Sequence, residues 1–80
     1  MTVRVRLFAG AAEAAGRTEW HTDSATVGEL IAEITAAGGP ETAEVLDRCS
    51  VLIDGTRAKG DEQELPAAAT VDVLPPFAGG

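Results

Sequence analysis

The sequence predicts one α+β domain, in which a mixed sheet of about four to five strands packs against one main helix. Three observations predict this class. Apolar and polar residues alternate over residues 2–8, which is typical of a half-buried strand. A capped amphipathic helix begins at Thr26, and residues 70–74 alternate again. A chain of 80 residues has room for one such domain.

An alanine-rich segment and a second strand follow the first strand. Residues 9–16 predict one short helical turn that ends at Gly16, since glycine readily adopts the left-handed conformation that closes helices. Residues 17–22, which carry Trp20, predict a strand that pairs antiparallel with the first across a wide connection.

The clearest helix signal starts at Thr26. Thr26 and Glu29 have the spacing of a capping box, in which each side chain accepts a hydrogen bond from an unpaired backbone N–H. Four apolar residues at helical spacing then form one face: Val27, Leu30, Ile31 and Ile34. Gly38 and Gly39 are expected to stop the helix, and Pro40 prevents its continuation.

The second half of the chain predicts a short helix and further strands. Residues 41–48 predict the helix, with three residues in line on one face: Ala43, Leu46 and Cys49. Residues 50–54 predict a strand that ends at the turn pair Asp54-Gly55. Residues 56–69 lack periodicity, apart from a short strand expected near 56–59. Residues 70–74 predict the last strand.

Strand parity divides the large apolar residues between the two faces of the sheet. Seven of them are expected to face the helix: Val3, Val5, Leu7, Val51, Ile53, Val71 and Val73. Phe8, Leu52 and Leu74 then face away, where no second helix of useful length is available to cover them. An exposed apolar patch often marks an interaction site. The alternative is that these residues are scattered, or are covered by loop 56–69.

Composition excludes several classes of function. With 13 acidic and six basic residues, the chain has a formal charge of −7, which disfavours binding to nucleic acid and favours protein partners with basic surfaces. One Cys and one His exclude an internal disulfide and ordinary zinc sites, and no metal is expected. The sequence contains no apolar run of about 20 residues, so we expect no membrane span. Its start is unlike a signal peptide, and we expect a cytoplasmic protein.

The C-terminal residues form the most specific motif. Pro75-Pro76 cannot extend a sheet ladder and favours an extended chain, so residues 1–76 are expected to form the domain and residues 77–80 a flexible tail. Four residues reach roughly 13–14 Å. Gly79 and Gly80 lack side chains, so the tail can enter a narrow channel and present an unhindered carboxylate.

The opening Val-Arg-Val-Arg-Leu-Phe-Ala, the capped helix and the closing Val-Asp-Val-Leu-Pro-Pro-Phe-Ala-Gly-Gly resemble the ubiquitin-like sulfur carriers, the MoaD/ThiS family. The chain is most similar to the small subunits of molybdopterin synthase. The resemblance implies a β-grasp fold. It also implies that an ATP-dependent partner adenylates Gly80, which becomes a thiocarboxylate, and that no cofactor is bound by the chain itself. The synthase large subunit then receives the tail, and sulfur passes to a pterin precursor.

On this interpretation Gly80 is the reactive residue and eight residues bind partners: Phe8, Leu52, Leu74, Pro75, Pro76, Phe77, Ala78 and Gly79. Three alternatives remain open at this point. The sulfur could serve another pathway (thiamin thiazole, cysteine or a specialised metabolite), the chain could be a protein modifier joined through Gly80, or it could be a plain binding module. Cys49 fits a small core residue better than a sulfur acceptor.

Overall fold

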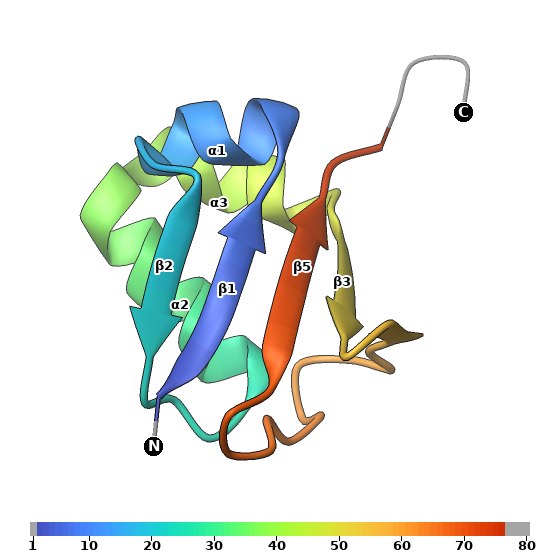
Figure 1. Cartoon of the computed structure of the whole chain (residues 1–80). Helices are drawn as coiled ribbons and strands as arrows, with labels where there is room; N and C mark the ends of the chain where they lie inside the picture. Colours follow the sequence, from blue (N-terminus) through green and yellow to red (C-terminus); the bar gives the residue numbers. More distant parts are fainter. Residues whose placement is uncertain (1, 77–80) are drawn as a thin grey trace.

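The computed structural model describes residues 2–76 and forms one five-stranded sheet with three helices (Figure 1). In chain order the elements are β1 (Val3–Leu7), α1 (Ala9–Ala15), β2 (Glu19–Thr22), α2 (Val27–Gly38), α3 (Pro40–Asp47), β3 (Ser50–Ile53), β4 (Thr56–Arg57) and β5 (Thr70–Leu74). Met1 and the predicted tail, residues 77–80, lie outside the described residues.

The sheet is mixed, as the sequence predicts, and its strand order is β2-β1-β5-β3-β4. The neighbouring interior strands β1 and β5 run parallel, and the other neighbouring pairs are antiparallel. Asp54 and Gly55 form the two-residue turn between β3 and β4, and both have the positive φ that such hairpins require (48° and 87°). The arrangement is the β-grasp fold that the resemblance implies.

The core lies between the sheet and the helices, and it confirms the strand parity. All seven residues expected to face inward are at most 9% exposed. They pack with the apolar face of α2, where Leu30 and Ile34 are fully buried. Leu65 and Ala69 also join this core from the segment between β4 and β5, where the sequence shows no period that would reveal them.

That segment packs against the start of α2. The Val27 and Gly28 N–H groups donate to the carbonyls of Gln63 (3.0 Å) and Asp61 (2.9 Å), while Thr26 Oγ1 accepts the Glu29 N–H at 3.2 Å. The first-turn donors of the helix are therefore satisfied by the loop and the capping residue together. The alternative that this loop covers the open sheet face is wrong.

Two details of the helices differ from the sequence prediction. α1 spans two turns rather than one, although it ends at Gly16 in the left-handed conformation as predicted (φ 81°). In α3 the buried residues are Thr42 and Leu46, whereas Ala43 is exposed and Cys49 lies beyond the helix. The buried face of α3 differs from the predicted one because Thr42 turns toward α1, where its Oγ1 donates to the Ala14 carbonyl at 3.2 Å.

Gly38, expected to stop α2, is instead its last residue, and Gly39 follows as the cap with a φ of 97°. Gly38 lies where α2, α1 and α3 meet. A Cβ atom at Gly38 would lie 2.8 Å from the Ala14 carbonyl oxygen and would overlap Thr42 Oγ1. The contact therefore selects glycine for its small size, at a position where propensity alone would favour alanine.

We expect Gly38→Ala to lower the free energy of unfolding by about 1–3 kcal/mol, because the added methyl group displaces buried groups. Gly10→Ala in α1 is the matched control, since nothing lies within 4 Å of its Cβ position. This control should leave stability unchanged or raise it by up to about 1 kcal/mol. Urea unfolding of both variants measures the difference. Equal stabilities would show that the helices do not meet closely at Gly38.

Candidate functional site: the open sheet face

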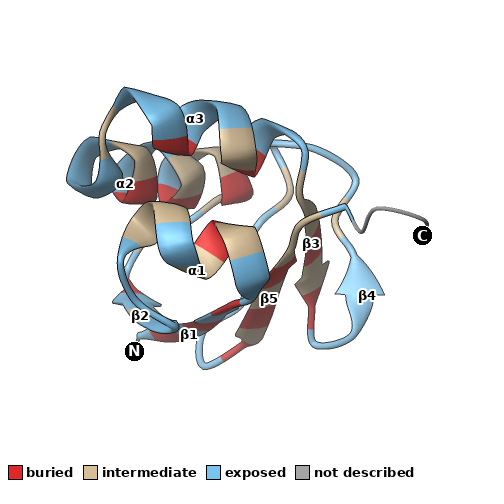
Figure 2. Cartoon of the chain, turned by 90° about the horizontal axis from the view of Figure 1, so that it is seen from above, coloured by how far each residue is buried: buried red, intermediate tan, exposed pale blue. Residues whose placement is uncertain are grey.

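All three helices lie on one side of the sheet and leave the other face uncovered (Figures 1 and 2). The strand residues on this open face alternate with the buried core residues. β1 contributes Arg4 and Arg6, and β5 contributes Thr70, Asp72 and Leu74. The residues paired with them on the neighbouring strands lie on the same face: Glu19 and His21 on β2, and Ser50 and Leu52 on β3. The face has an apolar end and a charged part.

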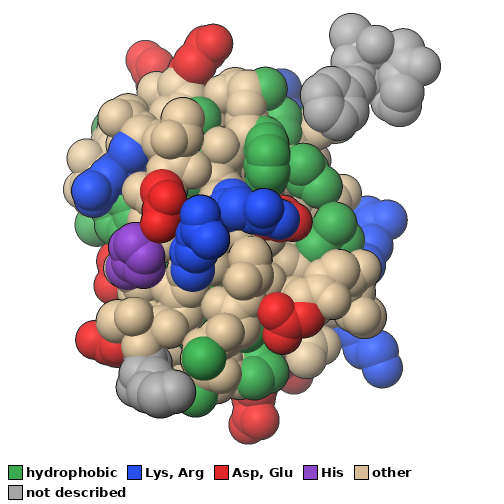
Figure 3. All heavy atoms as spheres, in the orientation of Figure 1, with side chains coloured by type: hydrophobic (Ala, Val, Ile, Leu, Met, Phe, Trp, Pro, Cys, Tyr) green, Lys and Arg blue, Asp and Glu red, His purple; other side chains and the backbone are tan. Residues whose placement is uncertain are grey.

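The apolar end consists of Phe8, Leu52 and Leu74, which we call the apolar patch. The parallel register pairs Leu7 with Val73, and the Phe8 N–H donates to the Val73 carbonyl at 3.2 Å, so Phe8 comes beside Leu74. Phe8 is 37% exposed, the only large apolar residue so exposed within residues 2–76, and Leu52 and Leu74 are half-buried. Figure 3 shows hydrophobic side chains gathered on this part of the face.

The described chain ends next to this patch. Because β1 and β5 are parallel, their carboxyl ends lie at the same edge of the sheet, so Pro75 and Pro76 leave β5 on the side where Phe8 follows β1 (Figure 1). Pro75 is half-buried and Pro76 is exposed. The remaining predicted site residues lie outside the described part of the chain, and their roles stay predictions: Phe77, Ala78, Gly79 and Gly80.

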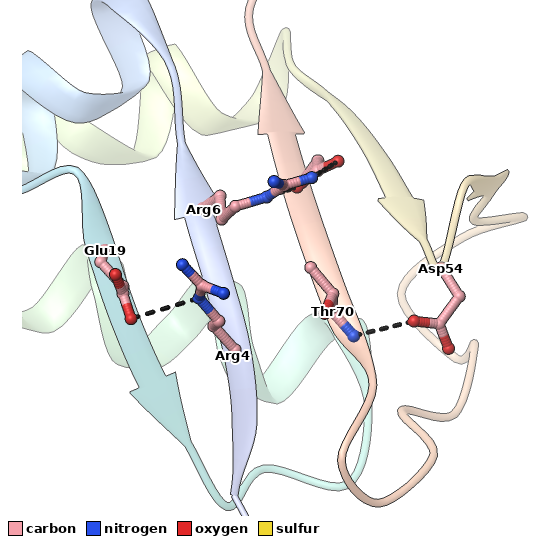
Figure 4. Close-up of polar contacts among 6 residues, drawn as sticks. Arg4, Arg6, Glu19, Asp54 and Thr70 are labelled. Atoms are coloured by element: carbon pink, nitrogen blue, oxygen red, sulfur yellow. Dashed lines mark hydrogen bonds and ion pairs between the residues drawn. The ribbon is translucent and has the colours of Figure 1, made fainter.

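A two-armed ion pair crosses the middle of the open face. Arg6 donates from Nε to Asp72 Oδ1 (2.6 Å) and from Nη2 to Oδ2 (2.9 Å), joining β1 to β5 (Figure 4). The hydrogen bond to Asp72 raises the pKa of Arg6, which favours its charged form. The Arg6 guanidinium also lies 5.9 Å from the centre of the Phe8 ring, which connects the charged part to the apolar patch.

The rest of the charged part surrounds Glu19. Its Oε2 lies 3.3 Å from Arg4 Nε and 3.2 Å from His21 Nε2, and all three side chains are about half exposed. Such contacts at the surface are weak and easily exchanged for contacts with a partner. Trp20 points to the helix side instead, where it packs against the core and its Nε1 donates to Glu33 Oε1 at 2.7 Å.

Cys49 is half-buried against the core, and its Sγ donates to the Val45 carbonyl at 3.2 Å. Burial raises the pKa of the Cys49 thiol, so less of the nucleophilic thiolate is present at neutral pH than for an exposed cysteine. These features agree with the structural role expected from the sequence.

Within residues 2–76, no group of three or more His, Cys, Asp or Glu side chains is placed to hold a metal ion. The same part of the chain has no helix long and apolar enough to cross a membrane. The segment between β4 and β5, which carries Asp61, contributes backbone carbonyls that accept the N–H groups of the first turn of α2. The open sheet face, with the chain end beside it, is therefore the candidate functional site.

Comparison with protein families matches residues 5–80 to the ThiS family. No curated protein gives a significant match. Among solved structures, small archaeal modifier protein 1 from Methanosarcina acetivorans has a TM-score of 0.81 at 26% identity, covering 99% of this chain and 96% of that one. A Pyrococcus furiosus protein assigned as molybdopterin converting factor, subunit 1, has a TM-score of 0.74 at 25% identity (96% and 99% covered).

A third structure is the complex of subunits 1 and 2 of molybdopterin-converting factor from Helicobacter pylori. The matching chain has a TM-score of 0.73 at 21% identity, with both chains covered completely, and this likeness shows the fold. The family match spans nearly the whole sequence and includes the Gly-Gly end. The chain therefore belongs to the ThiS family of ubiquitin-like sulfur carriers.

Proposed function

We propose that this sulfur carrier is the small subunit of molybdopterin synthase, and that its sulfur is held as a thiocarboxylate on Gly80. One observation carries the proposal. The parallel pairing of β1 and β5 brings the start of the Pro-Pro-Phe-Ala-Gly-Gly segment to the same edge of the sheet as the apolar patch. A partner that binds the patch is therefore within reach of the tail.

The chemistry requires an activating partner. A carboxylate resists attack because its negative charge repels nucleophiles. One oxygen of the Gly80 carboxylate attacks the α-phosphorus of ATP, pyrophosphate leaves, and an acyl adenylate forms. A sulfide equivalent then adds to the carbonyl carbon and AMP leaves, which produces the thiocarboxylate. Its soft sulfur is a nucleophile at neutral pH and can be transferred to a pterin precursor in the large subunit.

On this proposal the chain is a co-substrate, and the catalytic groups belong to its partners. The Cys49 thiol donates to the Val45 carbonyl, and the exposed His21 pairs with Glu19. Within residues 2–76, neither contact joins a nucleophile to a base. The Pro75-Pro76-Phe77 segment favours molybdopterin synthesis over thiazole synthesis, because the thiazole carriers that the chain resembles usually lack the two prolines. The Pyrococcus neighbour, at 25% identity, supports the same pathway.

A second candidate is a modifier joined to other proteins through Gly80, which the likeness to an archaeal modifier protein favours. The two candidates differ in the fate of the carbonyl carbon. A modifier forms a stable amide with a lysine, whereas a sulfur carrier is released with a carboxylate. Isopeptide-linked conjugates in the native cell would favour the modifier, and their absence together with sulfur transfer to a pterin would favour the synthase subunit.

We expect Phe8→Asp and Leu74→Asp to weaken binding of the large subunit at least tenfold, because each places a charge in the apolar patch. The free energy of unfolding should fall by less than about 2 kcal/mol, since neither residue is part of the buried core. Ala43→Asp, at an exposed position on α3, is the matched control and should bind normally. Titration calorimetry and urea unfolding measure the two quantities. Normal binding by both patch variants would exclude this face as the docking site.

We expect Gly79→Val and Gly80→Val to bind partners normally but to be adenylated, or to transfer sulfur, about a hundredfold more slowly. A side chain near the reacting carbonyl displaces it within the partner's channel, and small displacements at a reacting centre have effects of this size. Phe77→Ala should instead weaken binding first, as an aromatic anchor would. Single-turnover assays at saturating partner separate the two effects. Glycine variants that bind poorly but react normally when saturated would show that the tail contributes only affinity.

A further inference from the structure

The charges of the chain are unevenly distributed between the two sides of the sheet. Three of the six basic residues lie on strands of the open face, but only two of the 13 acidic residues do. These residues are Arg4, Arg6 and Arg57, and Glu19 and Asp72. The remaining 11 acidic residues lie on the helices and the connecting segments. A chain with a charge of −7 therefore presents a sheet face whose strand side chains carry more positive than negative charge (Figure 3).

The arginines of this face retain unused donors. Arg6 directs two of its five N–H groups at Asp72, which leaves three for other acceptors. Arg4 makes one contact with Glu19, at 3.3 Å, and its side chain is 54% exposed. Arg57 lies opposite Leu52 on the edge strand, is exposed, and makes no ion pair with the residues that the structure describes.

Two of the three arginines on this face are already paired with its carboxylates. Asp72 is already engaged by Arg6 on both oxygens, and Glu19 is shared between Arg4 and His21. Asp54, at the β3–β4 turn, accepts the backbone N–H of Thr70 at 2.9 Å (Figure 4). Arg57 lies opposite Leu52 and has no ion pair among the described residues, so it places unpaired positive charge beside the apolar patch.

We propose that the open face binds a protein surface that combines an apolar pocket for the patch with carboxylates opposite Arg4, Arg6 and Arg57. This reverses the expectation from net charge, which favours a basic partner. Phe8 and Leu74 supply the buried contact, and the arginines supply orientation and a faster encounter. This proposal depends on the proposed function in one respect: the synthase large subunit is the first partner with which it is tested.

The test compares association rates of charge-matched variants with the purified large subunit from the source organism. The double variant Arg4→Gln/Arg57→Gln lowers the positive charge of the face, and Arg48→Gln/Lys59→Gln removes two charges from elsewhere. We expect the first to associate about 3- to 10-fold more slowly at low salt and the second to change little. The difference should vanish at high salt, where charges are screened.

A variant of opposite sign makes the test sharper. Glu19→Gln removes a carboxylate from the face and frees Arg4, so it should speed association, whereas the control Glu44→Gln on α3 should not. Slower association of Glu19→Gln, or equal slowing by the two double variants, would overturn the proposal. Thermal unfolding confirms that each variant is folded.

Failure of the proposed function gives a different result. If the unaltered chain does not bind the large subunit, the same series is measured with the adenylating enzyme of that organism. If Arg4→Gln/Arg57→Gln slows association with the adenylating enzyme and Arg48→Gln/Lys59→Gln does not, the acidic partner surface is supported. Only the assigned pathway is then rejected. Equal association rates of the two double variants with both enzymes, or no binding to either enzyme, would reject the acidic partner surface itself.

Discussion

The parallel pairing of β1 and β5 is the constraint on which the rest of the structure depends. It joins residues 66 positions apart in the sequence, as the Arg6–Asp72 pair illustrates. Parallel strands require a long crossover, so the chain between them must leave the sheet, cover one face with helices and return. The same pairing places the carboxyl ends of both strands at one edge. Phe8 and the Pro75-Pro76 exit are therefore adjacent as a direct result of the topology.

The helical layer is held to the sheet by close backbone contacts as well as by apolar burial. Two carbonyls of the segment before β5 accept hydrogen bonds from N–H groups in the first turn of α2. A Cβ at Gly28 would lie 3.1 Å from Asp61 Cβ. Gly38 allows the same closeness at the other end of the helix. These contacts join α2 to the loop at one end and to α1 and α3 at the other, and all three helices lie on one side of the sheet (Figure 1).

Much of the fold could be predicted from the sequence, because strand parity and the capping box at Thr26 are local signals. The buried face of α3 could not, since it depends on the contact between Thr42 and α1. The burial of Leu65 and Ala69 could not be predicted either, because it depends on loop packing, which leaves no hydrophobic periodicity in the sequence. At the site, parity located the apolar patch. The excess of positive charge on the open face could be recognised only from the strand register, because the net charge of the chain does not show where its charged residues lie.

The most direct test of the central claim is the mass of the protein purified from its native cell, measured intact and after fragmentation. The account predicts a fraction in which one oxygen is replaced by sulfur, with the added mass confined to the C-terminal fragment that contains Gly80. The proportion should rise when the large subunit is deleted, because the sulfur is no longer consumed. Added sulfur on the fragment that contains Cys49, with an unmodified C-terminus, would contradict the account.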